Sequence, residues 1–258
     1  MDLQFKDKFL TQWQRYFNGA ELPIVFQYTD NGISAEPAVS LSRERCLIHV
    51  LQHVREGRSL RFFSRSFGCQ GGKFYTGYSS TLREHIGEFL SCGIEGELRG
   101  ERYKHTPQVA ENAISHAPWY EAPAAHMVFK RWDLLDEHDE PEVVIFFAAP
   151  DVLSALYTLA GFDDPVLENV VIAPFGSGCA SIIQYPYSEK LSGRNRAVIG
   201  MFDLTARPHV NPHCLSFTVT MERFRPMVNN MSESFLITPA WDHIRKRIHK
   251  HVELTSTV

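Results

Sequence analysis

The clearest structural signal in this sequence is the apolar run Val143-Val144-Ile145-Phe146-Phe147, followed by Ala148-Ala149-Pro150-Asp151. A strand with apolar side chains on both faces is typical of the interior of a sheet that is covered on both sides. Proline is well tolerated in the first turn of a helix, so a helix is expected from Pro150 to Gly161. The sequence therefore predicts a central strand that leads directly into a helix.

The segment after this helix repeats the same pattern. Val170-Val171-Ile172-Ala173 predicts a second buried strand, and Pro174-Phe175-Gly176-Ser177-Gly178-Cys179 leads into a helix that begins near Ala180. Alternating strands and helices with a glycine loop between them are typical of an α/β unit. We therefore expect a mixed α/β fold, with a sheet covered by helices and a strand order that the sequence leaves open.

Periodic segments extend this prediction to both ends of the chain. Apolar residues at helical spacing predict a helix over 5–17, before Asn18-Gly19, and a second helix capped by Ser40 or Ser42. The other predicted elements are strands at 24–28, 60–63, 127–129, 197–201 and 215–219, a helix from Ser79 or Ser80 toward Cys92, a helix over 107–116 and two helices at the C-terminal end. No linker composition interrupts the chain, so one domain over 1–258 is expected.

Composition and charge exclude several classes of protein. The chain has 258 residues, of which 44% are hydrophobic, so it can bury a core without disulfides or a structural metal. A net charge of -4 gives no long-range attraction for nucleic acid, and we interpret the basic stretch 245–251 as a solvated helix end. No apolar run of about 18 residues and no secretory signal are visible. We therefore expect a soluble, cytoplasmic protein with no nucleic-acid or membrane partner.

The cysteines carry the strongest hint of chemistry. Five cysteines, without any C-x-x-C pair, indicate reduced thiols rather than a disulfide framework. Cys69 lies in the glycine-rich stretch Phe67-Gly68-Cys69-Gln70-Gly71-Gly72, and Cys179 follows Gly176-Ser177-Gly178. Free N–H groups at the start of the next helix would hold an anionic group and favour the thiolate form of Cys179. Neither glycine segment matches a nucleotide-binding motif.

An ordered set of short motifs links this chain to a family. The set consists of Arg45-Cys46, Gly68-Cys69-Gln70-Gly71-Gly72 with Gly77, the strand 143–147 ending in Ala149-Pro150, and Gly178-Cys179. From about Ser40 onward it resembles domain-of-unknown-function family 169, whose name carries no activity. The resemblance implies cysteines at the positions of Cys46, Cys69 and Cys179. It also implies a further cysteine after the glycine of a later strand, where this chain has Gly200-Met201.

The leading hypothesis is a pocket at the two glycine segments. It would bind a small acidic ligand, or a thiolate-ligated metal or iron–sulfur cofactor, because open α/β sheets bind ligands at strand ends and soft metals prefer thiolates. The candidate ligand-binding residues are Gly71, Gly72, Gly176, Ser177, Gly178 and Arg207, and the candidate metal ligands are Cys46, Cys69 and Cys179.

Three alternatives remain open. The first is a non-enzymatic binding or assembly module, with inert buried cysteines and aromatic surfaces that form a homodimer. The second is a cysteine nucleophile, Cys69 or Cys179, with His209 or His213 as its base. The third is a metal held by His49 and His53, four residues apart on one helix face. Cys92 and Cys214 are expected to be dispensable, and no pattern names a reaction.

Overall fold

An eight-stranded mixed sheet forms the centre of the molecule in the computed structural model, which describes residues 1–31, 35–39 and 46–255. The strand order is β2-β3-β6-β1-β7-β10-β9-β8. The strands are β1 (Ile24–Thr29), β2 (Glu36–Pro37), β3 (Leu60–Phe62), β6 (His126–Arg131), β7 (Val143–Ala148), β8 (Val171–Ile172), β9 (Ala197–Gly200) and β10 (Leu215–Thr220). The central pairs are antiparallel, and the pairs β2–β3 and β8–β9 at the two edges are parallel.

Strand β7 is central, as predicted. It pairs with β1 on one side and β10 on the other, and all six of its residues are buried. Val144 and Phe146 pack into the hydrophobic cluster on one face of the sheet, whereas Val143 and Ile145 pack into the cluster on the other. The mixed α/β fold with a sheet covered by helices is thus confirmed, and the two-sided apolar run is explained by burial on both faces.

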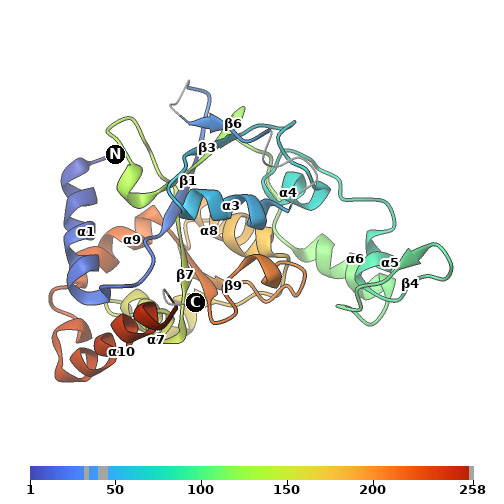
Figure 1. Ribbon diagram of the computed structural model, residues 1–258. Coiled ribbons are helices and arrows are strands. Elements are labelled where there is room, and N and C mark those ends of the chain that lie inside the picture. The colour runs from blue at the N-terminus through green and yellow to red at the C-terminus, as the bar shows by residue number, and fades with distance from the viewer. Residues whose placement is uncertain (32–34, 40–45, 256–258) are drawn as a thin grey trace.

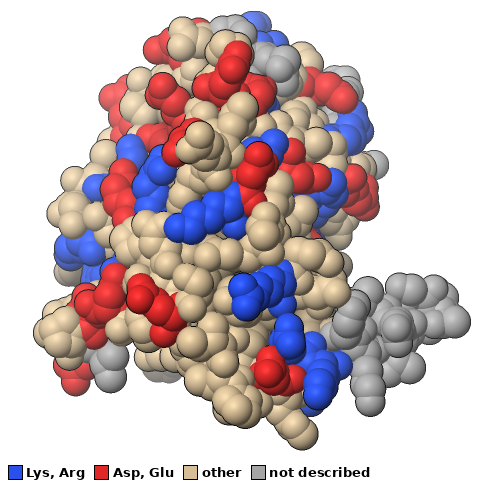
Figure 2. All heavy atoms as spheres, turned by 90° about the vertical axis from the view of Figure 1, so that its left-hand side faces the viewer, with Lys and Arg blue, Asp and Glu red and all other residues tan. Residues whose placement is uncertain are grey.

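Four helices cover the first face of the sheet: α1 (Leu3–Phe17), α7 (Pro150–Ala160), α9 (Met221–Asn230) and α10 (Pro239–Thr255) (Figure 1). The predicted N-terminal helix is confirmed, and Asp2 caps it by accepting a hydrogen bond from Gln4 N at 2.9 Å. Beneath these helices, Phe9 packs against Trp132 and Phe224 with ring centroids 5.0 and 5.1 Å apart. On the outer surface in Figure 2, Lys and Arg side chains are intermingled with Asp and Glu.

The second face is covered by α3 (Leu47–Arg55), the π-helix η3 (Ala180–Gln184) and α8 (Tyr185–Leu191). Helices η3 and α8 connect β8 to the parallel strand β9, so the predicted α/β unit is present. The expectation of a fully buried strand at 170–173 is wrong. Strand β8 spans two half-buried residues, because it lies at the edge of the sheet and has a neighbour on one side.

A segment between β3 and β6 extends away from the sheet, at the right of Figure 1. It contains α4 (Gln70–Tyr75), α5 (Ile86–Leu90), the antiparallel pair β4 (Gly93–Ile94) and β5 (Leu98–Arg99), and α6 (Pro107–His116). Helix α6 agrees with the prediction. The expected helix from Ser79 or Ser80 toward Cys92 is shortened to α5, since His85 adopts a left-handed conformation with a φ of 56°. The stretch after Cys69, expected as a loop, is the short helix α4.

The remaining predictions fall close to the observed elements. The strands predicted at 24–28, 60–63, 127–129, 197–201 and 215–219 correspond to β1, β3, β6, β9 and β10. Helix α3 begins at Leu47 with Cys46 at its N-cap; Ser40, Ser42 and Arg45 lie outside the described residues. Short 3-10 turns are η1 (Trp132–Leu134), η2 (Leu167–Asn169), η4 (Arg207–His209) and η5 (Phe235–Ile237). Within the described ranges, no helix is both long and apolar enough to span a bilayer.

Candidate ligand-binding site

A cavity of about 720 Å³ lies where the loops after β8 and β9 meet α3, α4 and the segment from α5 to α6. Strands β8 and β9 are parallel, and the lining residues of 175–180, together with Asp203, Thr205 and Ala206, follow their carboxyl ends. Open α/β sheets commonly bind ligands at this position. The volume falls within the range of about 300–1,000 Å³ that is typical of small-molecule sites.

The cavity brings together most of the residues that the sequence pointed to. Its lining includes Gly71, Gly72, Gly176, Ser177, Gly178, Cys46, Cys69 and Cys179. Arg207 is the exception and does not line the cavity, because its guanidinium group turns back on its own loop. There it donates hydrogen bonds to the carbonyl oxygens of Pro212, at 2.6 Å, and Cys214. Arg207 therefore stabilises the loop over 207–214.

Two of the cavity glycines lie in close packing, and at Gly178 a larger residue would clash. A Cβ atom on Gly178 would lie 2.7 Å from the Cβ of Ala206, and the Gly178 N–H donates a hydrogen bond to Asp203 at 3.0 Å. A Cβ atom on Gly72 would lie 3.1 Å from the Cys69 sulfur, which accepts a hydrogen bond from Gly72 N at 3.2 Å. At Gly72, the absence of a side chain lets the Cys69 sulfur approach the backbone.

The backbone beside Cys179 is held in unusual conformations. Helix η3 is wound as a π-helix, a rare form that is frequently found at functional sites. The Ser181 hydroxyl on η3 donates to Gly178 O at 2.8 Å and accepts from Met201 N at 3.2 Å. Met201 is fully buried with a φ of 69°, which is costly for a bulky side chain. Met201 packs behind Gly178 rather than lining the cavity.

Burial makes two of the three cavity cysteines weak acids. Desolvation raises the pKa of Cys179 well above its usual value, and it also raises the pKa of the half-buried Cys46 above 9.0. The charges of the neighbouring cysteines act in the same direction, so the three sulfur atoms lie close enough to interact electrostatically. The expectation that the helix start favours a Cys179 thiolate is therefore wrong, because desolvation outweighs it.

A metal centre receives no geometric support. Within the part of the chain that the structure describes, no group of three or more His, Cys, Asp or Glu side chains is arranged to hold a metal ion. The described lining also contains no histidine, and the His209 ring packs against that of His49 with centroids 5.0 Å apart. Neither the Cys–His nucleophile nor a pair of His49 and His53 is thus supported. Cys92 is exposed, and Cys214 packs against the core away from the cavity.

Among the described residues, three charged side chains line the cavity, and sequence reasoning missed all of them. Asp203 accepts hydrogen bonds from Gly178 N, from the Tyr103 hydroxyl at 3.1 Å, and from the Thr205 N–H and hydroxyl at 3.0 and 2.8 Å. Arg83 is exposed and lies 4.4 Å over the Phe89 ring, and Lys104 lies 5.5 Å over the Phe175 ring. The Asp203 carboxylate is therefore hydrogen-bonded within the protein, whereas the Arg83 and Lys104 cations lie over aromatic rings.

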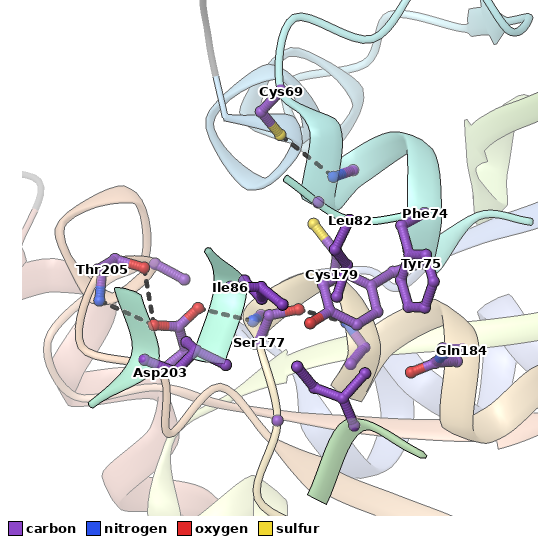
Figure 3. A pocket seen from close by; sticks show the side chains of 18 of the residues that line it. Cys69, Phe74, Tyr75, Leu82, Ile86, Ser177, Cys179, Gln184, Asp203 and Thr205 are labelled. Atoms are coloured by element: carbon purple, nitrogen blue, oxygen red, sulfur yellow. Dashed lines mark hydrogen bonds between the residues drawn. The ribbon is translucent and has the colours of Figure 1, made fainter. Parts of the chain in front are cut away.

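Tyr75 and Gln184 are among the uncharged polar residues of the wall that were also missed. Burial raises the pKa of Tyr75 to about 12, and its hydroxyl hydrogen-bonds to the Ser177 side chain. Gln184 lies in the wall and is 1% exposed. In Figure 3, Asp203 and Gln184 lie on opposite sides of Cys179 and Tyr75. No local motif marked these residues.

Comparison with known proteins places this site within a family. No curated protein and no solved structure matches the chain significantly. The sequence profile of domain-of-unknown-function family 169, described as an uncharacterised ArCR family, matches residues 22–230. That range includes all eight strands described for the sheet and every residue described as lining the cavity. The chain therefore belongs to domain-of-unknown-function family 169.

Proposed function

We propose that the cavity binds a small molecule with an apolar body and an anionic group. The observation that carries this proposal is the composition of the cavity wall. Apolar side chains make up much of it: Ile48, Phe74, Leu82, Ile86, Phe89, Leu90, Ala110, Ala113, Ile114, Ala117, Phe175, Ala180 and Ala206. An apolar wall with a few polar groups is the usual composition of a small-molecule site.

The preference for an anion follows from the charges at the cavity. Asp203 accepts hydrogen bonds from four N–H and O–H donors, and among the described residues it forms no ion pair with Arg83 or Lys104. Arg83 is exposed and Lys104 is half-buried, so both can reach a ligand at the open side. A cation above an aromatic ring keeps its charge available, and a carboxylate, sulfonate or phosphate would be attracted to it.

A matched pair of fluorescent probes tests the proposal. Anilinonaphthalene sulfonate combines apolar rings with an anion, and N-phenylnaphthylamine has the same rings without the charge. We expect the sulfonate to bind more tightly to the wild type, and Arg83→Gln or Lys104→Gln to weaken the sulfonate about fivefold, from ~1 kcal/mol per charge pair. Binding of the neutral probe should not change. Equal affinity for the two probes would contradict a preference for anions.

A second pair of variants locates the bound probe. Ala113 and Ser115 are both exposed residues of α6, and of the two only Ala113 lines the cavity. We expect Ala113→Trp to fill the cavity and abolish sulfonate binding, whereas Ser115→Trp should leave it unchanged. The same result for both variants would place the probe elsewhere on the surface and argue against the cavity as its site.

A thiolate-ligated cofactor is the second candidate. Its support is that Cys46, Cys69 and Cys179, distant in sequence, line the same cavity, and soft metals and iron–sulfur clusters prefer such ligands. Raised thiol pKa values oppose it, because a metal ligand must be deprotonated. Anaerobic reconstitution with iron and sulfide, with Cys46→Ser as the control, tests this candidate. A metal-free, colourless product would exclude it.

The assembly module with inert cysteines remains the rival function. It predicts no saturable binding of either probe, and thiols of Cys46, Cys69 and Cys179 that react with a disulfide reagent only after unfolding. Saturable sulfonate binding that Ala113→Trp removes would contradict it.

A further inference from the structure

The side-chain carbonyl of Gln184 is an unused hydrogen-bond acceptor in the cavity wall. Gln184 is the last residue of η3 and is 1% exposed. Its Oε1 atom is buried and has no hydrogen-bond partner among the residues that the structure describes. Leaving a buried carbonyl unpaired costs free energy, and native proteins keep few such groups. An unpaired acceptor in the wall of a cavity therefore points to a donor that arrives with a ligand.

The nearby donors of the wall already have partners. The Tyr75 hydroxyl hydrogen-bonds to Ser177, and the Ser177 hydroxyl accepts from Ala180 N at 3.1 Å. On the other side of Cys179 and Tyr75 in Figure 3, Asp203 is satisfied by its own donors. The polar groups around Asp203 thus already have hydrogen-bond partners, whereas the side-chain carbonyl of Gln184 does not.

The backbone of Gln184 is held in place by the rest of η3. Ser181, three residues earlier, is tied to Gly178 and Met201 through its hydroxyl, and its carbonyl accepts from the Thr218 hydroxyl at 3.2 Å. A Cβ atom on Gly200 would lie 2.2 Å from the Ser181 Cβ, so η3 is packed directly on β9. Because these contacts fix the helix, the buried amide is positioned before any ligand binds, which lowers the entropic cost of recognition.

We infer that the ligand donates an N–H or O–H hydrogen bond to Gln184 Oε1, which defines its class as an apolar acid that also carries a hydroxyl or amide group. This inference rests on the proposed function. Arg83 is exposed and Gln184 is buried, so the anion of the ligand lies at the open side and the donor at the inner wall. A site with a buried acceptor discriminates against analogues that lack the matching donor, because the acceptor is then left unpaired.

The test compares decanoate with ω-hydroxydecanoate, which differs by one hydroxyl group at the end remote from the acid. Isothermal titration calorimetry, or displacement of anilinonaphthalene sulfonate, gives the two dissociation constants. We expect the hydroxy acid to bind the wild-type protein about fivefold more tightly, as one net hydrogen bond allows. Gln184→Leu removes the acceptor at similar size and should bring the ratio of the two dissociation constants to one. Gln184→Glu keeps an oxygen at this position and should preserve a preference for the hydroxy acid.

Gln70→Leu is the matched control, since Gln70 also lines the cavity but is exposed and donates to Thr81 O at 3.4 Å. Gln70→Leu should leave the ratio of the two dissociation constants unchanged. A wild-type ratio of one, or a preference that survives in Gln184→Leu, would overturn the inference while the cavity remains a binding site. If Gln184→Leu does not fold, the ratios measured for the wild type and for Gln184→Glu still test the inference. Failure of both acids and of the sulfonate to bind would instead overturn the proposed function itself.

Discussion

The two faces of the sheet differ in how completely they are packed. Under α1, α7, α9 and α10, aromatic rings fill the space, and the buried Lys130 ammonium is paired with Asp139 at 2.8 Å and Asp136 at 3.0 Å. Under α3 and η3, the packing ends at a cavity, and Gln184 has a buried oxygen without a partner among the described residues. We therefore expect the first face to supply more of the stability and the second face, with its cavity, to supply the ligand site.

The largest difference between the faces is expected from truncating apolar side chains. Phe9 is fully buried and touches several rings, so Phe9→Ala should lower the free energy of unfolding by about 4 kcal/mol. Leu82 lines the cavity and is half-buried, so Leu82→Ala should cost less than about 1 kcal/mol. Urea unfolding measures both. Similar losses would show that the cavity side contributes as much to stability as the aromatic side.

The buried ion pair of the first face gives the next largest effect. Lys130→Met would leave the Asp139 carboxylate, 1% exposed, without its cation and should lower stability by about 3 kcal/mol. The double variant Lys130→Met with Asp139→Leu should recover much of that loss, since it removes the unpaired charge. Urea unfolding of the two variants at neutral pH checks this. A double variant no more stable than the single would contradict the explanation.

Gly178 links the fold to the cavity, so its substitution should affect both. Gly178→Ala brings a Cβ atom within 2.7 Å of Ala206, and the overpacking should cost about 2 kcal/mol. The displaced loop should also weaken binding of anilinonaphthalene sulfonate. Gly193→Ala is a useful contrast, because that glycine has open space around it, although its φ of 69° adds backbone strain. Unchanged binding of the sulfonate by Gly178→Ala would show that this loop does not contribute to the ligand site.

The last effect, which is confined to high pH and is absent at neutral pH, is expected from Tyr75. Burial raises its pKa from 10.0 to about 12, so the folded state binds the phenolic proton more tightly than the unfolded state. The resulting stabilisation is present below pH 10.0 and is lost as the pH rises toward 12. Tyr75→Phe should therefore show a shallower loss of stability across this range than the wild type.

Tyr157→Phe is the control for this experiment, because Tyr157 is an exposed tyrosine of α7. Chemical unfolding under reducing conditions at several pH values gives the slopes. An identical slope for wild type and Tyr75→Phe would contradict the effect of burial on this side chain.

Local patterns in the sequence were sufficient to predict most elements. The two-sided apolar run over 143–147 predicted a central strand, and the periodicity over 5–17 predicted α1, because both signals arise from residues that are neighbours in the chain. The pairing of glycine with cysteine at Gly72 and Gly178 also pointed to the cavity. This local pattern is informative because a side chain can approach the backbone closely only where the backbone residue is small.

Tertiary structure decided which residues meet. The strand order places β9 beside β8, and only this neighbourhood brings Asp203 and Gln184 to one cavity with Arg83 and Lys104 from the segment beyond α4. The same long-range packing made β8 an edge strand, left Arg207 outside the site and buried Cys179 deeply enough to raise the pKa of its thiol. Burial and convergence depend on contacts between distant segments, and local periodicity carries no information about them.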